Sequence, residues 1–196
     1  MLRCSRESVS LEASHPQQSL LEICAKALMK NPVKRPKEGD VVSVKLDDGR
    51  FAVGVLARVE TARPRKPYGI FVYFFGPLED PHKALAHVHE LGAQGFVLRL
   101  ITSALNIYSG EWQVLGTVRD WRRDQWPFPD FYVSNVFTEK YFRVRLSEHD
   151  LATNIQREPI PDKGDLEEDA AHGSGAAQQE LSRKMANLPS IDKKYH

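Results

Sequence analysis

Three histidines are the side chains of this sequence best suited to binding a metal ion. His82, His87 and His89 follow one another at spacings of five and two residues. On a helix, these spacings do not bring all three imidazole rings to one face, whereas the ligands of a metal ion must converge on one point. We therefore expect histidines that face solvent, and no metal site.

Carboxylates and thiols give no clear catalytic pattern either. Asp47 and Asp48 precede Gly49, and an Asp-Gly pair is typical of a tight turn, so their predicted role is structural. The sequence contains no Gly-rich phosphate loop, no His-Glu-x-x-His motif and no nucleophile elbow. Cys4 and Cys24 are too few for a disulfide framework, which indicates free thiols in a reducing compartment.

An enzyme site could still assemble in space from residues that lie far apart in the sequence. Asp40, Glu148 and His149 are the candidates for such a site. No motif connects these three residues, so we expect no enzymatic activity, no catalytic residue and no cofactor.

Two clusters combine basic and aromatic side chains: Arg63, Arg65, Lys66 and Tyr68 in the first, and Trp121, Arg122, Arg123 and Trp126 in the second. Such residues bind single-stranded nucleic acid, and they also dominate hot spots between proteins. A formal net charge of +1 provides no global attraction to nucleic acid or to an anionic membrane, which favours a protein partner. A packing role is the commonest one for tryptophan and stays open for both tryptophans.

Strands are expected to position these clusters. The turn at 47–49 predicts a β-hairpin between strands at 41–45 and 51–56. Further strands are predicted at 70–75, 96–101, 112–118 and 141–146, and a packed loop at 121–132 because two prolines interrupt it. Helical spacing of apolar residues predicts amphipathic helices at 16–30 and 78–92. The expected fold class is α+β, mostly β, with a twisted antiparallel sheet or a small partly open barrel and one or two packed helices.

The composition predicts four segments. Residues 1–15 form a flexible leader, 16–155 a single β-rich domain with an N-terminal helix, 156–176 an acidic flexible linker and 177–196 a short terminal helix or tail. No window approaches the roughly 18 apolar residues of a membrane span, so we expect a cytoplasmic protein without membrane contact. The oligomeric state stays open, since the helix at 16–30 and the strand at 141–146 could each form a two-fold contact.

Four motifs follow one another along the sequence. They are KEGDVV at 37–42, LDDGRFAVG at 46–54, VYFFG at 72–76, and the stretch from 112 that ends in WPxPxF at 126–131. In this order and separation, from about Lys37 to Leu146, the chain resembles the immunity protein 26 family of bacterial polymorphic toxin systems. The resemblance implies a mostly β domain that is encoded beside a toxin, neutralises it by binding and has no catalytic activity. Fold likeness does not identify the partner.

We therefore expect a cytosolic immunity protein that covers the active site of a cognate toxin domain encoded by a neighbouring gene. The residues expected to bind this partner are Arg63, Arg65, Lys66, Trp121, Arg122 and Arg123. A variant of this hypothesis uses the acidic stretch 167–169 as a phosphate mimic in the groove of a nuclease toxin. The rival hypothesis is a small-barrel adaptor that binds single-stranded nucleic acid or an extended peptide along the strand ending at Phe75.

Overall fold

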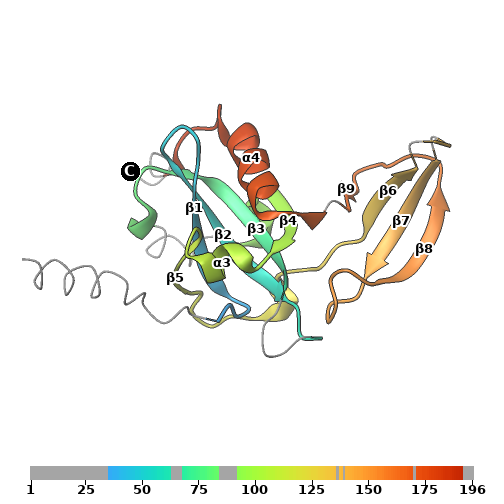
Figure 1. The fold of residues 1–196 in the computed structure, drawn as a ribbon, viewed down its shortest axis with the longest axis horizontal. Coiled ribbons are helices and arrows are strands. Elements are labelled where there is room, and N and C mark those ends of the chain that lie inside the picture. Colours follow the sequence, from blue (N-terminus) through green and yellow to red (C-terminus); the bar gives the residue numbers. More distant parts are fainter. Residues whose placement is uncertain are drawn as a thin grey trace, which may run out of the picture. The chain divides into compact units, whose positions relative to one another are not determined.

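The computed structural model of this chain describes residues 35–62, 68–83, 92–135, 137–138, 140–169 and 171–191 (Figure 1). All of them belong to the unit formed by residues 33–196. The predicted leader at 1–15, the predicted helix at 16–30 and the basic side chains of Arg63, Arg65 and Lys66 lie outside the described residues.

A six-stranded sheet carries most of the core, with the strand order β10-β4-β3-β2-β1-β5. Its strands are β1 (Asp40–Lys45), β2 (Phe51–Val59), β3 (Gly69–Leu78), β4 (Leu98–Ser103), β5 (Gln113–Thr117) and β10 (Ala171–His172). All neighbouring strands run antiparallel except β10 and β4, which are parallel.

The predicted hairpin is confirmed by the pairing of β1 with β2. The Leu46 main-chain N–H donates to the carbonyl of Arg50 at 2.8 Å, which closes the turn. Gly49 has a φ of +88°, a left-handed conformation that glycine adopts without the steric cost of a Cβ atom. Local sequence signals were therefore sufficient for this element.

A second sheet has the order β8-β7-β6-β9, with β6 (Phe131–Asn135), β7 (Lys140–Leu146), β8 (Asn154–Ile160) and β9 (Glu167–Glu168). The strand predicted at 141–146 corresponds to β7. The end of the loop predicted at 121–132 instead belongs to β6, because Phe131 and Tyr132 pair with Val144 and Arg143 of β7.

Residues 156–176 differ from the predicted flexible linker. They hold the end of β8, all of β9 and β10, and the start of a helix, α4 (Ser174–Met185). The side chains of β8 are mostly exposed, so the stretch has little apolar surface. Its main chain pairs with β7 all the same, and ladder hydrogen bonds do not depend on the polarity of the side chains.

The remaining elements are short. Among the described residues they are α3 (Leu105–Ser109) and the single-turn 3₁₀ helices η1 (Pro81–Lys83), η3 (Ala93–Gly95) and η4 (Arg123–Gln125). Of the helix predicted at 78–92, only residues 78–83, which include η1, and residue 92 lie within the described residues. The strands predicted at 96–101 and 112–118 correspond to β4 and β5, with shifted ends. No helix among the described residues combines the length and the apolar composition that crossing a bilayer requires.

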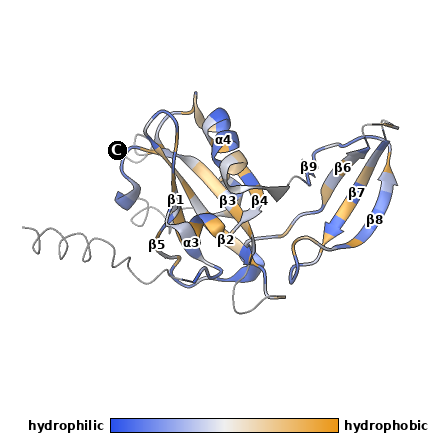
Figure 2. Ribbon diagram, viewed as in Figure 1, coloured by the Kyte–Doolittle hydropathy of each residue, from blue (hydrophilic) through white to orange (hydrophobic). Residues whose placement is uncertain are grey.

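Both faces of the six-stranded sheet are buried. On β3, Val72 and Phe74 point to one face, and Tyr73 and Phe75 to the other. The terminal helix expected within 177–196 corresponds to α4, which packs on the first face with Ala177, Leu181 and Met185 fully buried. Figure 2 shows the apolar residues concentrated along β2 and β3.

The second face of the sheet packs against aromatic and aliphatic residues from other segments of the chain, among them Trp126, Phe131 and Val144. Phe131 and Val144 come from β6 and β7, so the two sheets share this part of the core. The predicted fold class, α+β and mostly β, is confirmed, and the sheets are open rather than closed into a barrel.

Candidate partner-binding surface

Asp40, one of the three residues considered for an enzyme site, has a structural role. Asp40 is fully buried, and its carboxylate accepts hydrogen bonds from Thr117 Oγ1 at 2.8 Å and from the main-chain N–H of Lys37 at 3.0 Å. It thereby ties the start of β1 to β5. Within the described ranges, no three His, Cys, Asp or Glu side chains are grouped as metal ligands.

Trp121 packs partly into the fold. Its ring stacks on Trp126 with 5.3 Å between centroids and 28° between planes. The Trp121 ring also lies close to Gly39, where an added Cβ would be 2.9 Å from the ring. Gly39 has a φ of +83°, so both the turn and the close approach of the ring require glycine. The rest of the Trp121 ring remains partly exposed.

Arg122 lies on the surface, with 64% of its side chain exposed, and pairs with Asp124 at 2.7 Å. The hydrogen bond from Arg122 holds the pKa of Asp124 below its usual range and raises the pKa of the guanidinium. An ion pair as exposed as this one contributes little to stability. Both side chains can therefore be rearranged by a partner at low cost.

Arg123, in η4, belongs to a chain of alternating charges. Its guanidinium lies 3.4 Å from Glu38 and 2.8 Å from Glu148, and 44% of its side chain is exposed. Glu148 also binds Arg58 at 2.7 Å, and the Arg58 side chain is only 5% exposed. The surface arginine is therefore positioned through Glu148 by a buried one, which restricts its conformations before any partner binds.

Both ends of the basic loop at 63–67 are held by hydrogen bonds. The main-chain N–H groups of Thr61 and Ala62 donate to the carbonyl of His149 at 3.0 and 2.9 Å. Glu60 is buried and accepts from the main-chain N–H groups of Tyr68 and Gly69 at 2.8 Å each. The loop thus leaves and re-enters the fold at a defined place.

Two consecutive residues connect the predicted clusters. Glu148 binds Arg123 of the second cluster, and His149 binds the main chain at the start of the first. Thr61 Oγ1 also lies 2.9 Å from Nδ1 of His149. We call the resulting region the Glu148 surface; it consists of Thr61, Ala62, Tyr68, Arg122, Arg123, Glu148 and His149.

Two carboxylates that position this surface, Glu60 and Glu148, are not among the residues predicted to bind a partner. A carboxylate at the end of a strand and just before a basic loop, as at Glu60, is a recognisable signal. The sequence suggests Glu148 only as a candidate for an enzyme site. Nothing in its sequence context indicates that it joins Arg58 to Arg123, because the three residues come from separate segments.

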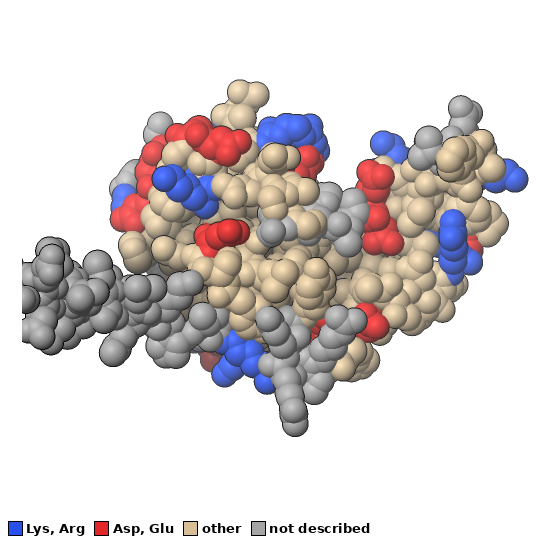
Figure 3. All heavy atoms as spheres, in the orientation of Figure 1, with Lys and Arg blue, Asp and Glu red and all other residues tan. Residues whose placement is uncertain are grey.

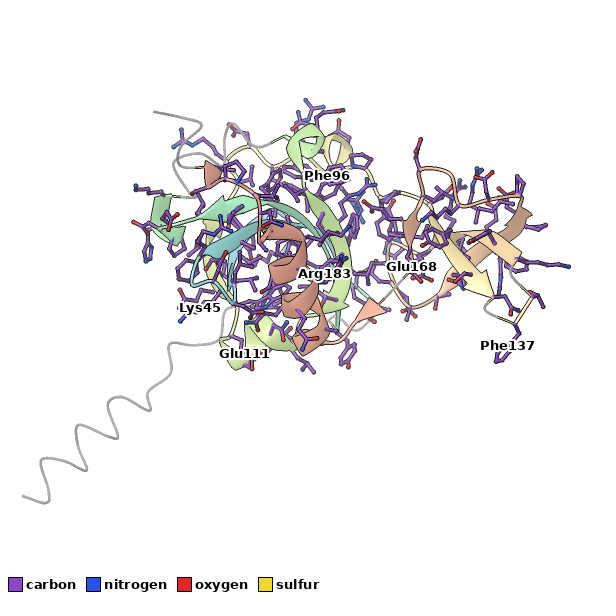
Figure 4. All side chains as sticks on the ribbon, turned by 90° about the horizontal axis from the view of Figure 1, so that it is seen from above. Lys45, Phe96, Glu111, Phe137, Glu168 and Arg183 are labelled. Carbon is purple, nitrogen blue, oxygen red and sulfur yellow. The ribbon has the colours of Figure 1, made fainter. Side chains whose placement is uncertain are left out.

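The acidic stretch at 167–169 is partly committed to the fold. Glu167 accepts from Nε of Arg99 at 3.0 and 2.9 Å, and burial raises its pKa. The main-chain N–H of Asp169 donates to the carbonyl of Tyr132 at 2.8 Å, and burial raises the pKa of its carboxyl as well. Glu168, labelled in Figure 4, is exposed. The stretch therefore offers one exposed carboxylate rather than three to a nuclease groove.

The strand ending at Phe75 cannot accept an added peptide strand. Phe75 lies in β3, which pairs with β2 on one side and with β4 on the other. Both edges of β3 are therefore occupied. The side chain of Phe75 is buried as well. The most exposed aromatic side chain among the described residues is Phe137, 99% exposed in the turn between β6 and β7, from which it projects away (Figure 4).

On the face shown in Figure 3, the basic side chains lie in small separate groups, and acidic side chains occur between them. Binding to a nucleic acid backbone relies on a continuous basic surface. The Glu148 surface instead carries both signs, since Arg122 pairs with Asp124 and Arg123 pairs with Glu148. This mixture suits a partner with a complementary pattern of charges, as at an interface between proteins.

A family model described as immunity protein 26 matches residues 37–143, which is more than half of the chain. The matched range contains β1 to β6 and most of β7, together with Arg58, Glu60 and the segment from Trp121 to Arg123. It ends before Glu148 and before α4. No curated protein and no solved structure matches the chain.

Proposed function

Because the chain belongs to the immunity protein 26 family, we propose that it binds and neutralises a cognate bacterial toxin domain by covering the active site of that domain. Membership of this family implies a toxin-neutralising role. The mode of binding, the surface used and the place of the toxin gene are our proposals. We place the toxin gene beside the gene for this chain and the complex in the cytoplasm, and we expect this protein to act without enzymatic activity.

The observation that carries this proposal is the junction at Glu148 and His149. It positions Arg123 and the start of the loop with Arg63, Arg65 and Lys66, and Glu60 holds the end of the same loop. Tryptophan, tyrosine and arginine are the residues most enriched in binding hot spots, and Trp121, Tyr68 and the arginines supply them here. Side chains held in place before binding lose less conformational entropy when the complex forms.

The charges of the Glu148 surface have a further role. Arg122 and Arg123 are each at least 44% exposed, so a toxin domain with acidic groups around its active site would be attracted to them. Complementary charges at the rim of an interface mainly accelerate association and select the correct partner. We therefore expect the association rate to fall as the salt concentration rises.

Co-expression tests the proposal directly. The toxin domain encoded beside this gene is expressed in a bacterium with and without this protein, and survival and co-purification are measured. We expect survival and a stable complex only when both proteins are present. Killing that persists while this protein is well expressed and folded would overturn the proposal.

A pair of matched variants tests the surface. Arg123→Ala removes an arginine that is 44% exposed and paired with Glu148, and Arg143→Ala removes one that is 46% exposed and paired with Glu158 on β8. We expect the first variant to weaken toxin binding by roughly tenfold or more and the second to leave it unchanged. Equal affinities of the two variants would remove Arg123 from the interface.

A further inference from the structure

A cavity of about 210 Å³ opens beside the Glu148 surface. Tyr68, at the end of the basic loop, borders it on one side, and the loop at 147–153 borders it on another. The buried side chains of Ile101 and Leu151 line it from within the fold. Its walls are mainly apolar. We call it the Tyr68 cavity.

Three polar side chains of the lining are engaged within the fold. Glu60 accepts two main-chain N–H groups at 2.8 Å each. Ser103 Oγ accepts from the main-chain N–H of Leu105 at 3.2 Å, and Asp150 accepts from Thr153 Oγ1 at 2.9 Å. A polar guest would therefore gain little here in exchange for the hydrogen bonds to water that it gives up.

The two carboxylates do not make the cavity a cation site. Glu60 already has its hydrogen-bond donors, and Asp150 is only half-buried, so water screens its charge. Gly173, at the N-terminal end of α4, also borders the cavity, and the positive end of a helix dipole opposes a cation. A charged group would also lose its hydration between the apolar walls. The lining therefore favours a neutral, apolar guest.

The volume of the cavity fits one side chain. A cavity of roughly 150 Å³ with apolar walls holds a benzene-sized molecule, whereas sites for drug-sized molecules usually measure roughly 300–1,000 Å³. At about 210 Å³, the Tyr68 cavity suits a single leucine, methionine or phenylalanine side chain. Burial of such a side chain is strongly favourable.

The position of the cavity indicates where this side chain comes from. Tyr68 belongs to the Glu148 surface, and 53% of the residue is exposed. The loop at 147–153 contributes Glu148 and His149 to the same surface and Leu151 to the cavity wall. A partner seated on the Glu148 surface would therefore lie next to the mouth of the cavity. Hot spots between proteins form where an anchor residue fills such a pocket.

We propose that the Tyr68 cavity binds one large apolar side chain, leucine, methionine or phenylalanine, that projects from the toxin domain. This inference rests on the proposed function, since it names the chemistry of the partner at the same surface. The toxin domain thus carries an apolar anchor residue beside the region that contacts Arg122 and Arg123. Such an anchor selects the cognate partner, because a charged residue at that position would lose its hydration without gaining a partner.

A small probe tests the ligand class without the toxin. The full chain is titrated with Nα-acetyl-L-leucine N-methylamide and followed by the NMR signals of its main-chain amides. The matching asparagine compound, which has almost the same shape but a polar side chain, is the control. We expect saturable shifts at Gly69, Ser103 and Ala152 with a dissociation constant on the order of millimolar, and at least about tenfold weaker binding of the asparagine compound. Equal binding of both compounds, or no saturable shift with the leucine compound, would overturn the proposal.

Two substitutions connect the probe to the cavity. Ala152→Trp adds a large ring at an exposed residue of the lining, and Ala186→Trp makes the same change at an exposed residue outside it. Melting temperatures show that both variants fold. We expect only Ala152→Trp to weaken binding of the leucine compound, because its ring obstructs the cavity. Equal affinities of the two variants would place the probe elsewhere and overturn the proposal.

Competition with the toxin domain provides the second arm, and it uses the unmodified protein. The leucine compound at ten times its dissociation constant should weaken the apparent affinity for the toxin domain by about tenfold, whereas the asparagine compound at the same concentration should leave it nearly unchanged. Toxin binding that the leucine compound does not weaken would overturn the cavity proposal and leave the proposed function standing. Failure of the protein to bind the toxin domain, with the leucine compound still bound, would overturn the function and support the ligand class of the cavity.

Discussion

Arg50, in the turn of the first hairpin, donates a hydrogen bond from Nη1 to the main-chain carbonyl of Leu188 at 2.6 Å. Its Nη2 also lies 3.0 and 3.1 Å from the carbonyls of Met185 and Ala186. The last carbonyls of a helix have no partner within the helix and attract positive charge. Arg50, which lies within the range matched by the family model, therefore anchors α4, which lies outside that range.

Replacing Arg50 with methionine should loosen the C-terminal end of α4. The substitution keeps most of the aliphatic chain and removes the guanidinium donors to the three carbonyls; the Met185 carbonyl still accepts from the main-chain N–H of Leu188 at 3.1 Å. We expect the free energy of unfolding to fall by about 1–2 kcal/mol, measured by urea denaturation. Asp48 holds the guanidinium at 2.6 Å, so Asp48→Asn should cost less than the loss of Arg50 itself. A stability equal to that of the wild type would mean that water replaces the arginine.

Gly39 should tolerate a side chain less well than Gly49. Both have a positive φ, +83° and +88°, so alanine strains the main chain at either site, by about 1 kcal/mol. At Gly39 the new Cβ would also lie 2.9 Å from the Trp121 ring, whereas nothing lies within 4 Å at Gly49. We therefore expect Gly39→Ala to lower stability further and to change tryptophan fluorescence. An identical effect of both substitutions would show that Trp121 moves aside freely.

Asp169 should make the protein less stable as pH rises through the acidic range. Burial raises the pKa of its carboxyl in the folded state, so the folded protein keeps this proton at pH values at which the unfolded chain has lost it. This contribution to stability is present below the unfolded pKa of about 3.9 and is lost as pH rises through the folded pKa. Asp169→Asn should therefore stabilise the protein at pH 7, by roughly 0.5 kcal/mol, and not at pH 3.

Thermal unfolding of the Asp169→Asn variant at several pH values measures this effect. Asp165→Asn is the control, because Asp165 is exposed and belongs to the same segment. The account of Asp169 is wrong if both variants change the stability equally at pH 7, since the effect would then come from the overall charge of the segment.

Replacing Glu148 should lower the stability more than replacing Arg123, because Glu148 pairs with two arginines, one of them buried. Glu148→Ala removes the partner of Arg58, whose side chain is 5% exposed, and of the half-exposed Arg123. A buried charge without its partner is costly, although Arg58 still donates to the carbonyl of Ala57 at 2.7 Å. We expect a loss of about 2 kcal/mol for Glu148→Ala, and less than about 1 kcal/mol for Arg123→Ala. Similar losses for the two variants in urea denaturation would contradict this order.

Local signals in the sequence were enough for several elements. The first hairpin follows from an Asp-Gly turn between β-branched residues, and the stripe on α4 follows from apolar residues at helical spacing. β8 could not be predicted in this way. Its side chains are mostly exposed, and a pattern of buried and exposed positions is what identifies a strand in a sequence. Pairing with β7 makes this segment a strand.

For the candidate surface, the sequence alone shows the two clusters of arginines, tryptophans and a tyrosine, and it contains the motifs that identify the family. The meeting of these clusters depends on contacts between segments far apart in the sequence. Glu148 reaches Arg123 and Arg58, and the carbonyl of the next residue, His149, receives the main chain that leads into the basic loop. Long-range pairs of this kind leave no periodicity in the sequence, because each depends on where whole strands and loops pack.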